Sequence, residues 1–78
     1  MALKYIKVEY KGSEILVLFP EFVEHIDIAN KFGGVEKVLS AGFCAVKDEY
    51  AICMGKSISI HKKSDEQEDT KILKRMLA

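Results

Sequence analysis

The segment 35–60 constrains the fold most, because it reads as a hairpin whose two strands sort into one bulky face and one small face. A turn with Asp48 and Glu49 at its tip pairs Cys44 with Cys53. The bulky face then carries Leu39, Ala41, Phe43, Ala45, Tyr50, Ile52, Met54, Ile58 and Ile60. The small face carries Val38, Ser40, Gly42, Cys44, Val46, Ala51, Cys53, Gly55, Ser57 and Ser59. This division predicts an antiparallel sheet better than it predicts a function.

A second hairpin is expected at the start of the chain. Apolar and charged residues alternate over 3–10, which is typical of a strand with one solvated face. Gly12 and Ser13 suit a type II′ turn, which places Tyr10 opposite Ile15. The partner strand, 15–19, is apolar on both faces and ends at Pro20.

Each hairpin is followed by a predicted helix. The first covers 21–32 and begins either with Pro20 at its first turn or only near His25, and Gly33 and Gly34 end it. The second begins at Ser64, with Gln67 completing a capping box. The order is ββαββα, so we expect an α+β fold in which both helices pack on one face of an antiparallel sheet. The bulky face would receive the apolar side chains Phe22, Ile26, Ile72 and Met76.

Length and charge exclude several classes of protein. The 78 residues form one domain, 1–78, and twelve basic residues cancel twelve acidic ones, so no overall field attracts nucleic acid or an anionic membrane. The longest apolar run, 15–20, is too short to span a bilayer, and early charges such as Lys4 and Lys7 argue against a signal peptide. We expect a cytoplasmic protein with reduced cysteines.

Catalytic and metal sites find little support in the sequence. His25 and Asp27 are two positions apart, so they do not share a helix face as an acid–base pair would. Two cysteines and two histidines match a zinc site in number but not in spacing. We therefore predict no enzyme, no metal and no cofactor, and a small enzyme or redox protein built on His25, Asp27 or the thiols is the weakest hypothesis.

The small face is the best candidate for an interaction surface. Small side chains let another backbone approach closely, and neighbouring leucines on the same side of the first hairpin add apolar area. One of the chain's own helices or water could cover it instead. The predicted protein interface is Ser40, Gly42, Cys44, Cys53, Gly55, Ser57, Ser59, Leu16 and Leu18.

A basic run near the second helix supports an alternative. If that helix folds back over the strand with the basic run, its own basic residues extend the run into a surface that could bind nucleic acid. Acidic residues beside the run cancel much of its positive electrostatic field. The residues of this alternative are Lys56, His61, Lys62, Lys63, Lys74 and Arg75.

Several short stretches resemble a family of small proteins of tailed phages and prophages, over about residues 15 to 77. They are Phe19-Pro20-Glu21, His25-Ile26-Asp27-Ile28-Ala29, Gly33-Gly34, Leu39-Ser40-Ala41-Gly42-Phe43, Met54-Gly55-Lys56-Ser57-Ile58-Ser59, and Asp69 ahead of Leu73. The resemblance implies a phage origin and transfers no catalytic or binding residue. The family pattern has a single cysteine near Cys53, which argues against a functional cysteine pair.

The sequence thus favours a small non-enzymatic protein-binding module of a phage or prophage. Its partner would be a host or phage protein, or a second copy in a homodimer. A nucleic-acid-associated accessory protein is the alternative.

Overall fold

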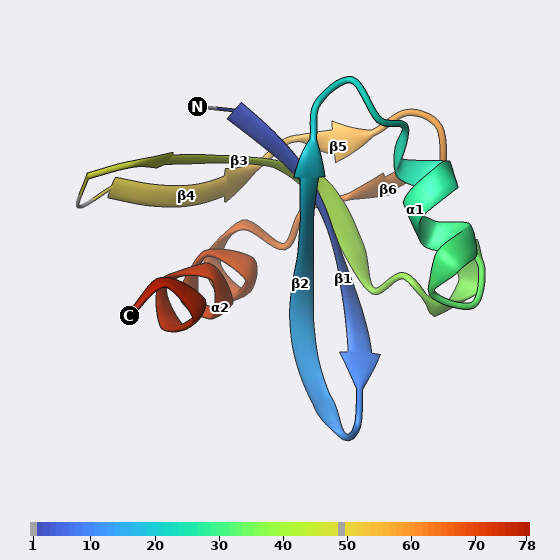
Figure 1. The fold of residues 1–78 in the computed structure, drawn as a ribbon, viewed down its shortest axis with the longest axis horizontal. Coiled ribbons are helices and arrows are strands. Elements are labelled where there is room, and N and C mark those ends of the chain that lie inside the picture. The colour runs from blue at the N-terminus through green and yellow to red at the C-terminus, as the bar shows by residue number, and fades with distance from the viewer. Residues whose placement is uncertain (1, 49) are drawn as a thin grey trace.

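The computed structural model describes residues 2–48 and 50–78, which form two antiparallel sheets and two α-helices (Figure 1). The larger sheet has the strand order β2-β1-β3-β4, and the smaller is the two-stranded ribbon β5–β6. The predicted α+β class is confirmed. The elements are β1 (Ala2–Tyr10), β2 (Ser13–Pro20), α1 (His25–Lys31), the 3-10 helix η1 (Val35–Lys37), β3 (Ser40–Lys47), β4 (Tyr50–Met54), β5 (Lys56–Ser57), β6 (Lys62–Lys63) and α2 (Glu66–Leu77).

The register predicted for the β3–β4 hairpin is confirmed. Cys44 pairs with Cys53, and Phe43 pairs with Met54. Asp48 takes a positive φ of 50°, as a tight two-residue turn requires, while Glu49 lies outside the described residues. Alternation along these strands therefore produces the two faces that the sequence predicts.

The register predicted for the first hairpin is wrong by two residues. Tyr10 pairs with Ser13, and the turn consists of Lys11 and Gly12, whose φ angles are 51° and 81°. Two positive φ values are typical of a type I′ turn, whose twist matches that of the flanking strands. Because the shift is by two positions, every side chain keeps its expected face.

The first helix follows the later of the two predicted starts. It begins at His25. At its C-terminal end Gly33 has a φ of 101°, and the amide of Gly34 donates to the carbonyl of Ala29 at 2.9 Å. This is the expected glycine termination. Phe22 precedes the helix and is 85% exposed, so its expected place in the core is wrong.

The strand β4 ends earlier than predicted. Gly55 has a φ of 81°, which breaks the strand, and the chain then turns back on itself in the β5–β6 ribbon. Ile60 reaches the core from this turn, whereas Ile58 is 79% exposed. The bulky face is therefore shorter than the sequence suggests.

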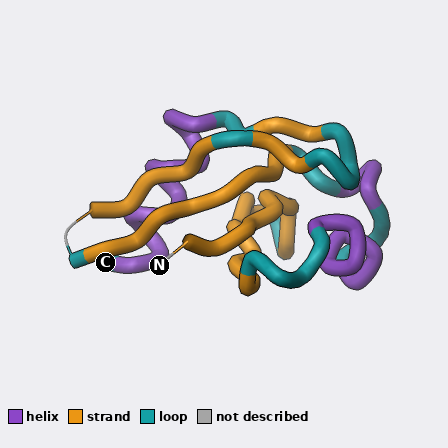
Figure 2. Tube along the Cα trace, turned by 90° about the horizontal axis from the view of Figure 1, so that it is seen from above, coloured by secondary structure: helices purple, strands orange, loops and turns teal. Residues whose placement is uncertain are grey.

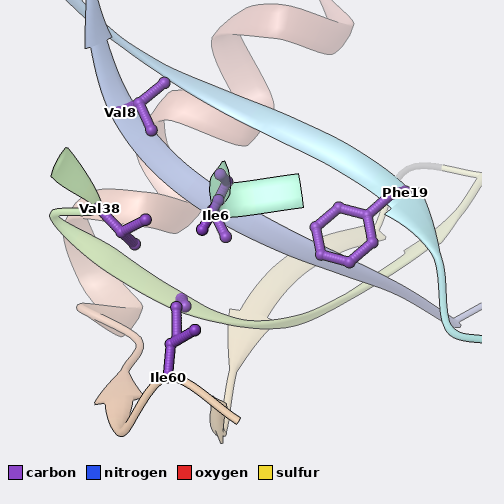
Figure 3. Close-up of a cluster of buried hydrophobic side chains, with 7 residues drawn as sticks. Ile6, Val8, Phe19, Val38 and Ile60 are labelled. Atoms are coloured by element: carbon purple, nitrogen blue, oxygen red, sulfur yellow. The ribbon is translucent and has the colours of Figure 1, made fainter. Parts of the chain in front are cut away.

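The two helices lie on opposite faces of the sheet, not on the same face. Ala29 of α1 packs in one buried cluster with Ile6 of β1, and Leu73 of α2 packs in another with Tyr5. Adjacent residues of a strand point to opposite faces, so the helices are separated by the sheet. Figure 3 shows the first cluster, and in Figure 2 the C-terminal helix lies beside the β3–β4 hairpin, away from α1.

Helix α2 presents a narrower apolar stripe to the sheet than the sequence suggests. Ile72 and Leu73 are buried, whereas Met76 is 46% exposed. Ile72 also packs on the small face and not on the bulky one. Within the described residues, no helix is both long and apolar enough to cross a membrane.

Candidate functional site

Helix α2 covers the small face, so most of the predicted protein interface lies inside the molecule. Ser40, Cys44, Cys53, Ser57 and Leu16 are each at most 3% exposed. Their prediction as an outer surface is wrong, because Cys44, Cys53 and Leu16 pack against Ile72 and Leu73 of α2 and Ser40 binds Asp69 of that helix, while Ser57 is buried in β5. Of the remaining members, Gly42 is also buried, Leu18 and Ser59 are half-buried, and Gly55 is exposed at the end of β4.

Gly42 shows how closely the chain packs on this face. A Cβ at this position would lie 2.5 Å from the carbonyl oxygen of Met54 and 3.3 Å from that of Gly55. Real Cβ atoms do not approach a backbone oxygen so closely, so only glycine fits here. The segment that leaves β4 therefore crosses directly over β3.

The two cysteines are compact packing residues, as the sequence predicts. Both are free thiols in the cluster beneath α2, beside Tyr5 and Leu73. Burial raises the pKa of Cys44, and burial together with the nearby Cys44 and Asp69 raises the pKa of Cys53 to about 12. Thiols of this kind react slowly because the thiolate is the reactive form.

A buried carboxylate joins α2 to the sheet. Asp69 is fully buried, and its Oδ2 accepts hydrogen bonds from the Tyr5 hydroxyl at 2.5 Å, the Ser40 hydroxyl at 2.7 Å and the Asp65 amide at 3.0 Å. Its Oδ1 lies 2.8 Å from the ammonium of Lys7, which compensates the negative charge. One side chain thus ties α2 to both β1 and β3.

The electrostatics of this cluster favour the ion pair. Burial alone would raise the pKa of Asp69, but hydrogen bonds from Lys7, Tyr5, Ser40 and the Asp65 amide together lower it. Burial likewise opposes the charge of Lys7, yet Asp69 raises its pKa overall. The pKa of Tyr5 is raised, first by burial and then by Asp69, so its hydroxyl remains a hydrogen-bond donor.

This cluster holds the fold together and does not present reactive groups to solvent. Tyr5, Asp69, Ser40 and Lys7 are all at most 6% exposed. From the sequence, Lys7 belongs to the charged positions of a strand with one solvated face, and nothing there indicated that Asp69 would turn inward to meet it. Ser64 is not the helix cap either, since its hydroxyl donates to the carbonyl of Gly55.

The structure separates His25 from Asp27. His25 is 3% exposed, lies edge-on to the rings of Phe19 and Phe43, and its Nε2 is 2.9 Å from the carbonyl oxygen of Gly42. Burial lowers its pKa more than the Gly42 carbonyl raises it. Asp27 is exposed on the first turn of α1. The two residues therefore form no acid–base pair.

The predicted basic surface is divided between two places. Lys56, His61, Lys62 and Lys63 line one hollow at the β5–β6 ribbon. Lys74 lies beside the tip of the β3–β4 hairpin, which is at the other end of the molecule from the ribbon (Figure 1). The expected continuous surface that included Lys74 and Arg75 is wrong, because α2 runs away from the ribbon toward the hairpin tip.

An apolar surface remains on the other side of the β3–β4 hairpin, and we call it the open face. Cross-strand pairs place its members together on the side of the hairpin opposite Cys44 and Cys53, and at the outer strand Ile52 also lines a hollow with residues of α2. Tyr50 is 56% exposed and Met54 is 39% exposed, while the other members are half-buried. The open face consists of Phe43, Ala45, Tyr50, Ile52 and Met54.

The open face belongs to the bulky side, where the sequence predicted core. The signal was present, because the five residues alternate regularly, but α2 took the small side instead. Comparison with family models, with curated proteins and with solved structures found no match to the chain.

Proposed function

We propose that the protein is a small non-enzymatic binding module that recognises another protein through the open face. The observation that supports this proposal is the apolar character of that face. Antiparallel sheets that turn one face to solvent usually carry polar residues there. Here five apolar side chains share one solvent-accessible surface, which is typical of a protein contact site.

The arrangement of this face suits a partner that docks on a rigid sheet. Cys44 and Cys53, directly behind it, are fixed beneath α2, and the outer edge of β4 is held by Thr70, whose hydroxyl accepts from the Cys53 amide at 2.9 Å. A preformed surface loses little conformational entropy on binding. Tyr50 and Met54 add the aromatic and flexible apolar side chains that protein interfaces favour.

The partner is a host or phage protein in the proposed phage setting, or a second copy of the chain. The resemblance to small phage proteins and the cytoplasmic location both remain predictions. The partner's contact surface should be mainly apolar, because the five side chains of the open face are apolar. Two lysines share this side of the sheet: Lys47 pairs with Tyr50, and Lys4 pairs with Phe43.

A pair of matched substitutions tests this proposal. Met54→Lys places a charge within the open face, and Tyr10→Lys places one at an exposed apolar residue at the far end of β1. Light scattering after size exclusion measures self-association, and affinity capture from a bacterial lysate measures other partners. We expect Met54→Lys to abolish the complex and Tyr10→Lys to leave it intact, with unchanged circular dichroism for both. Equal binding by both variants would contradict the proposal.

A further inference from the structure

The β5–β6 ribbon gathers positive charge at one point of the surface. Lys56 pairs directly with Lys63, and Ser57 pairs with Lys62. Like charges opposite one another weaken a strand pair, and a two-stranded ribbon is only marginally stable by itself. The arrangement therefore costs stability unless an anion offsets the repulsion.

The ribbon encloses a hollow whose walls are fixed by the core. The hollow measures about 460 Å³ and is lined by Lys56, Ser57, Ile58, His61, Lys62 and Lys63. Ser57 and Ile60 are buried and anchor both arms of the turn. The amide and the hydroxyl of Ser64 both bind the Gly55 carbonyl, at 2.9 Å and 2.8 Å, and close the base of the ribbon.

The turn adds a second feature that favours a binding site. His61 has a φ of 54°, in the left-handed region that residues other than glycine seldom adopt. Lys11 and Asp48 adopt the same conformation in the two hairpin turns, so this geometry belongs to the tight turn of the ribbon. It places the histidine ring on the wall of the same hollow as the three lysines.

No carboxylate lines this hollow, and among the described residues the ion pairs involve other lysines. Glu24 lies 4.0 Å from Lys4 and shares a neighbouring hollow with Lys56 and Ile58, but it forms no ion pair with Lys56. The charges of Lys56, Lys62 and Lys63 are therefore free to bind an external anion. Lys56 and Lys63 lie side by side on one face of the ribbon, and two ammonium groups match the multiple charge of a phosphate better than the single charge of a carboxylate.

We propose that the hollow of the β5–β6 ribbon binds the phosphate of a phosphate ester, with the paired Lys56 and Lys63 as its main donors and with His61 and Lys62 lining the same hollow. Ile58, 79% exposed on the wall of the hollow, provides the apolar contact for the organic part of the ester. The ester is either a free mononucleotide or one link of a nucleic-acid backbone. The site adjoins the open face, since Phe43 shares a hollow with Lys56 and Ile58, but its donors belong to the ribbon, so its failure would leave the proposed protein-binding function untouched.

The test compares two double variants that remove the same charge. Lys56→Gln/Lys63→Gln alters the ribbon, and Lys74→Gln/Arg75→Gln alters α2 far from it. Titrations with adenosine monophosphate and with a single-stranded thymidine oligonucleotide are followed by the backbone amide signals of residues 55–64. We expect the ribbon variant to bind at least about tenfold more weakly, as loss of a charge-assisted hydrogen bond implies. The α2 variant should bind as the natural chain does.

Each outcome of these titrations decides the question. Binding of the mononucleotide supports a small-molecule site, and tighter, strongly salt-dependent binding of the oligonucleotide alone supports a backbone site. Absence of binding to both ligands, or equal weakening by both variants, would overturn the proposal. The ribbon variant should fold normally, because it removes a repulsive pair, and thermal unfolding in the absence of ligand checks this.

Discussion

The hydroxyl of Tyr5 offers a sharp test of how α2 is held to the sheet. It is fully buried and donates to the ionised carboxylate of Asp69, so Tyr5→Phe removes one hydrogen bond and leaves Lys7 and Ser40 in place. A hydrogen bond to a charged group contributes about 1.5–3 kcal/mol. A chain of this length has a total stability of about 4–12 kcal/mol, so the loss is a substantial share.

We expect Tyr5→Phe to lower the free energy of unfolding by about 2 kcal/mol. In urea, a slope of about 1 kcal/mol per molar shifts the midpoint by ~2 M, which circular dichroism measures readily. Tyr10→Phe is the matched control, because Tyr10 is 53% exposed and should change stability by less than about 0.5 kcal/mol. A loss for Tyr5→Phe no larger than that of the control would refute the argument that this bond fastens α2.

Other predictions follow from the same contacts. Asp69→Asn leaves the buried ammonium of Lys7 with only the exposed Glu14, 3.8 Å away, as a counter-charge and should cost about 3 kcal/mol in chemical denaturation, whereas a loss below that of Tyr5→Phe would argue against the ion pair. The pKa of Asp69 is lowered in the folded state, so the ionised carboxylate stabilises the fold fully above about pH 4. This contribution is lost as the pH falls further, and urea midpoints measured down to pH 2 should fall steeply. The lowered pKa of His25 means that the unfolded chain binds more protons below about pH 6.5, so stability should fall between pH 7 and pH 5, and this slope should flatten in His25→Gln. Gly42→Ala should prevent normal folding, because the new Cβ would lie 2.5 Å from a backbone oxygen. In Gly12→Ala the new Cβ meets no atom, so this variant should lose only about 1 kcal/mol of stability through its positive φ. Thermal melts in which Gly12→Ala is the less stable variant would contradict the packing described.

The hairpins show which parts of the fold can be predicted from sequence. The pairing of Cys44 with Cys53 follows from a two-residue turn between alternating strands, and the structure confirms it. In the first hairpin each side chain keeps its predicted face, but the pairing differs from the predicted register by two residues. The sequence placed the turn at Gly12 and Ser13, whereas the turn consists of Lys11 and Gly12, both with positive φ. Alternation therefore predicts faces more securely than it predicts turn positions.

The placement of α2 could not be predicted in the same way. Asp69 looks like any other acid of a helix N-terminus, and its contact with Tyr5 joins residues 64 positions apart. Nothing in the local pattern indicates which acid turns inward to meet Lys7. The small face was therefore predicted as an interaction surface, although α2 covers it with Ile72 and Leu73.

The candidate surfaces were predicted only in part. The lysines and His61 of the ribbon follow one another closely in sequence, so their proximity was predictable, whereas Lys74 required knowledge of the direction of α2. The open face was identified as a bulky surface but was assigned to the interior. Which of two apolar faces a helix covers depends on its long-range contacts, and periodicity does not report these.

The labelling rate of the two thiols beneath α2 can measure how often that helix detaches from the sheet. Cys44 and Cys53 are 1% and 0% exposed, and a labelling reagent reaches them only when α2 lifts from the sheet or the whole chain unfolds. Their labelling rate relative to that of a free thiol therefore gives the free energy of opening. The β3–β4 hairpin carries the open face on its other side, so the same rate would report whether occupation of that face slows detachment of the helix behind it.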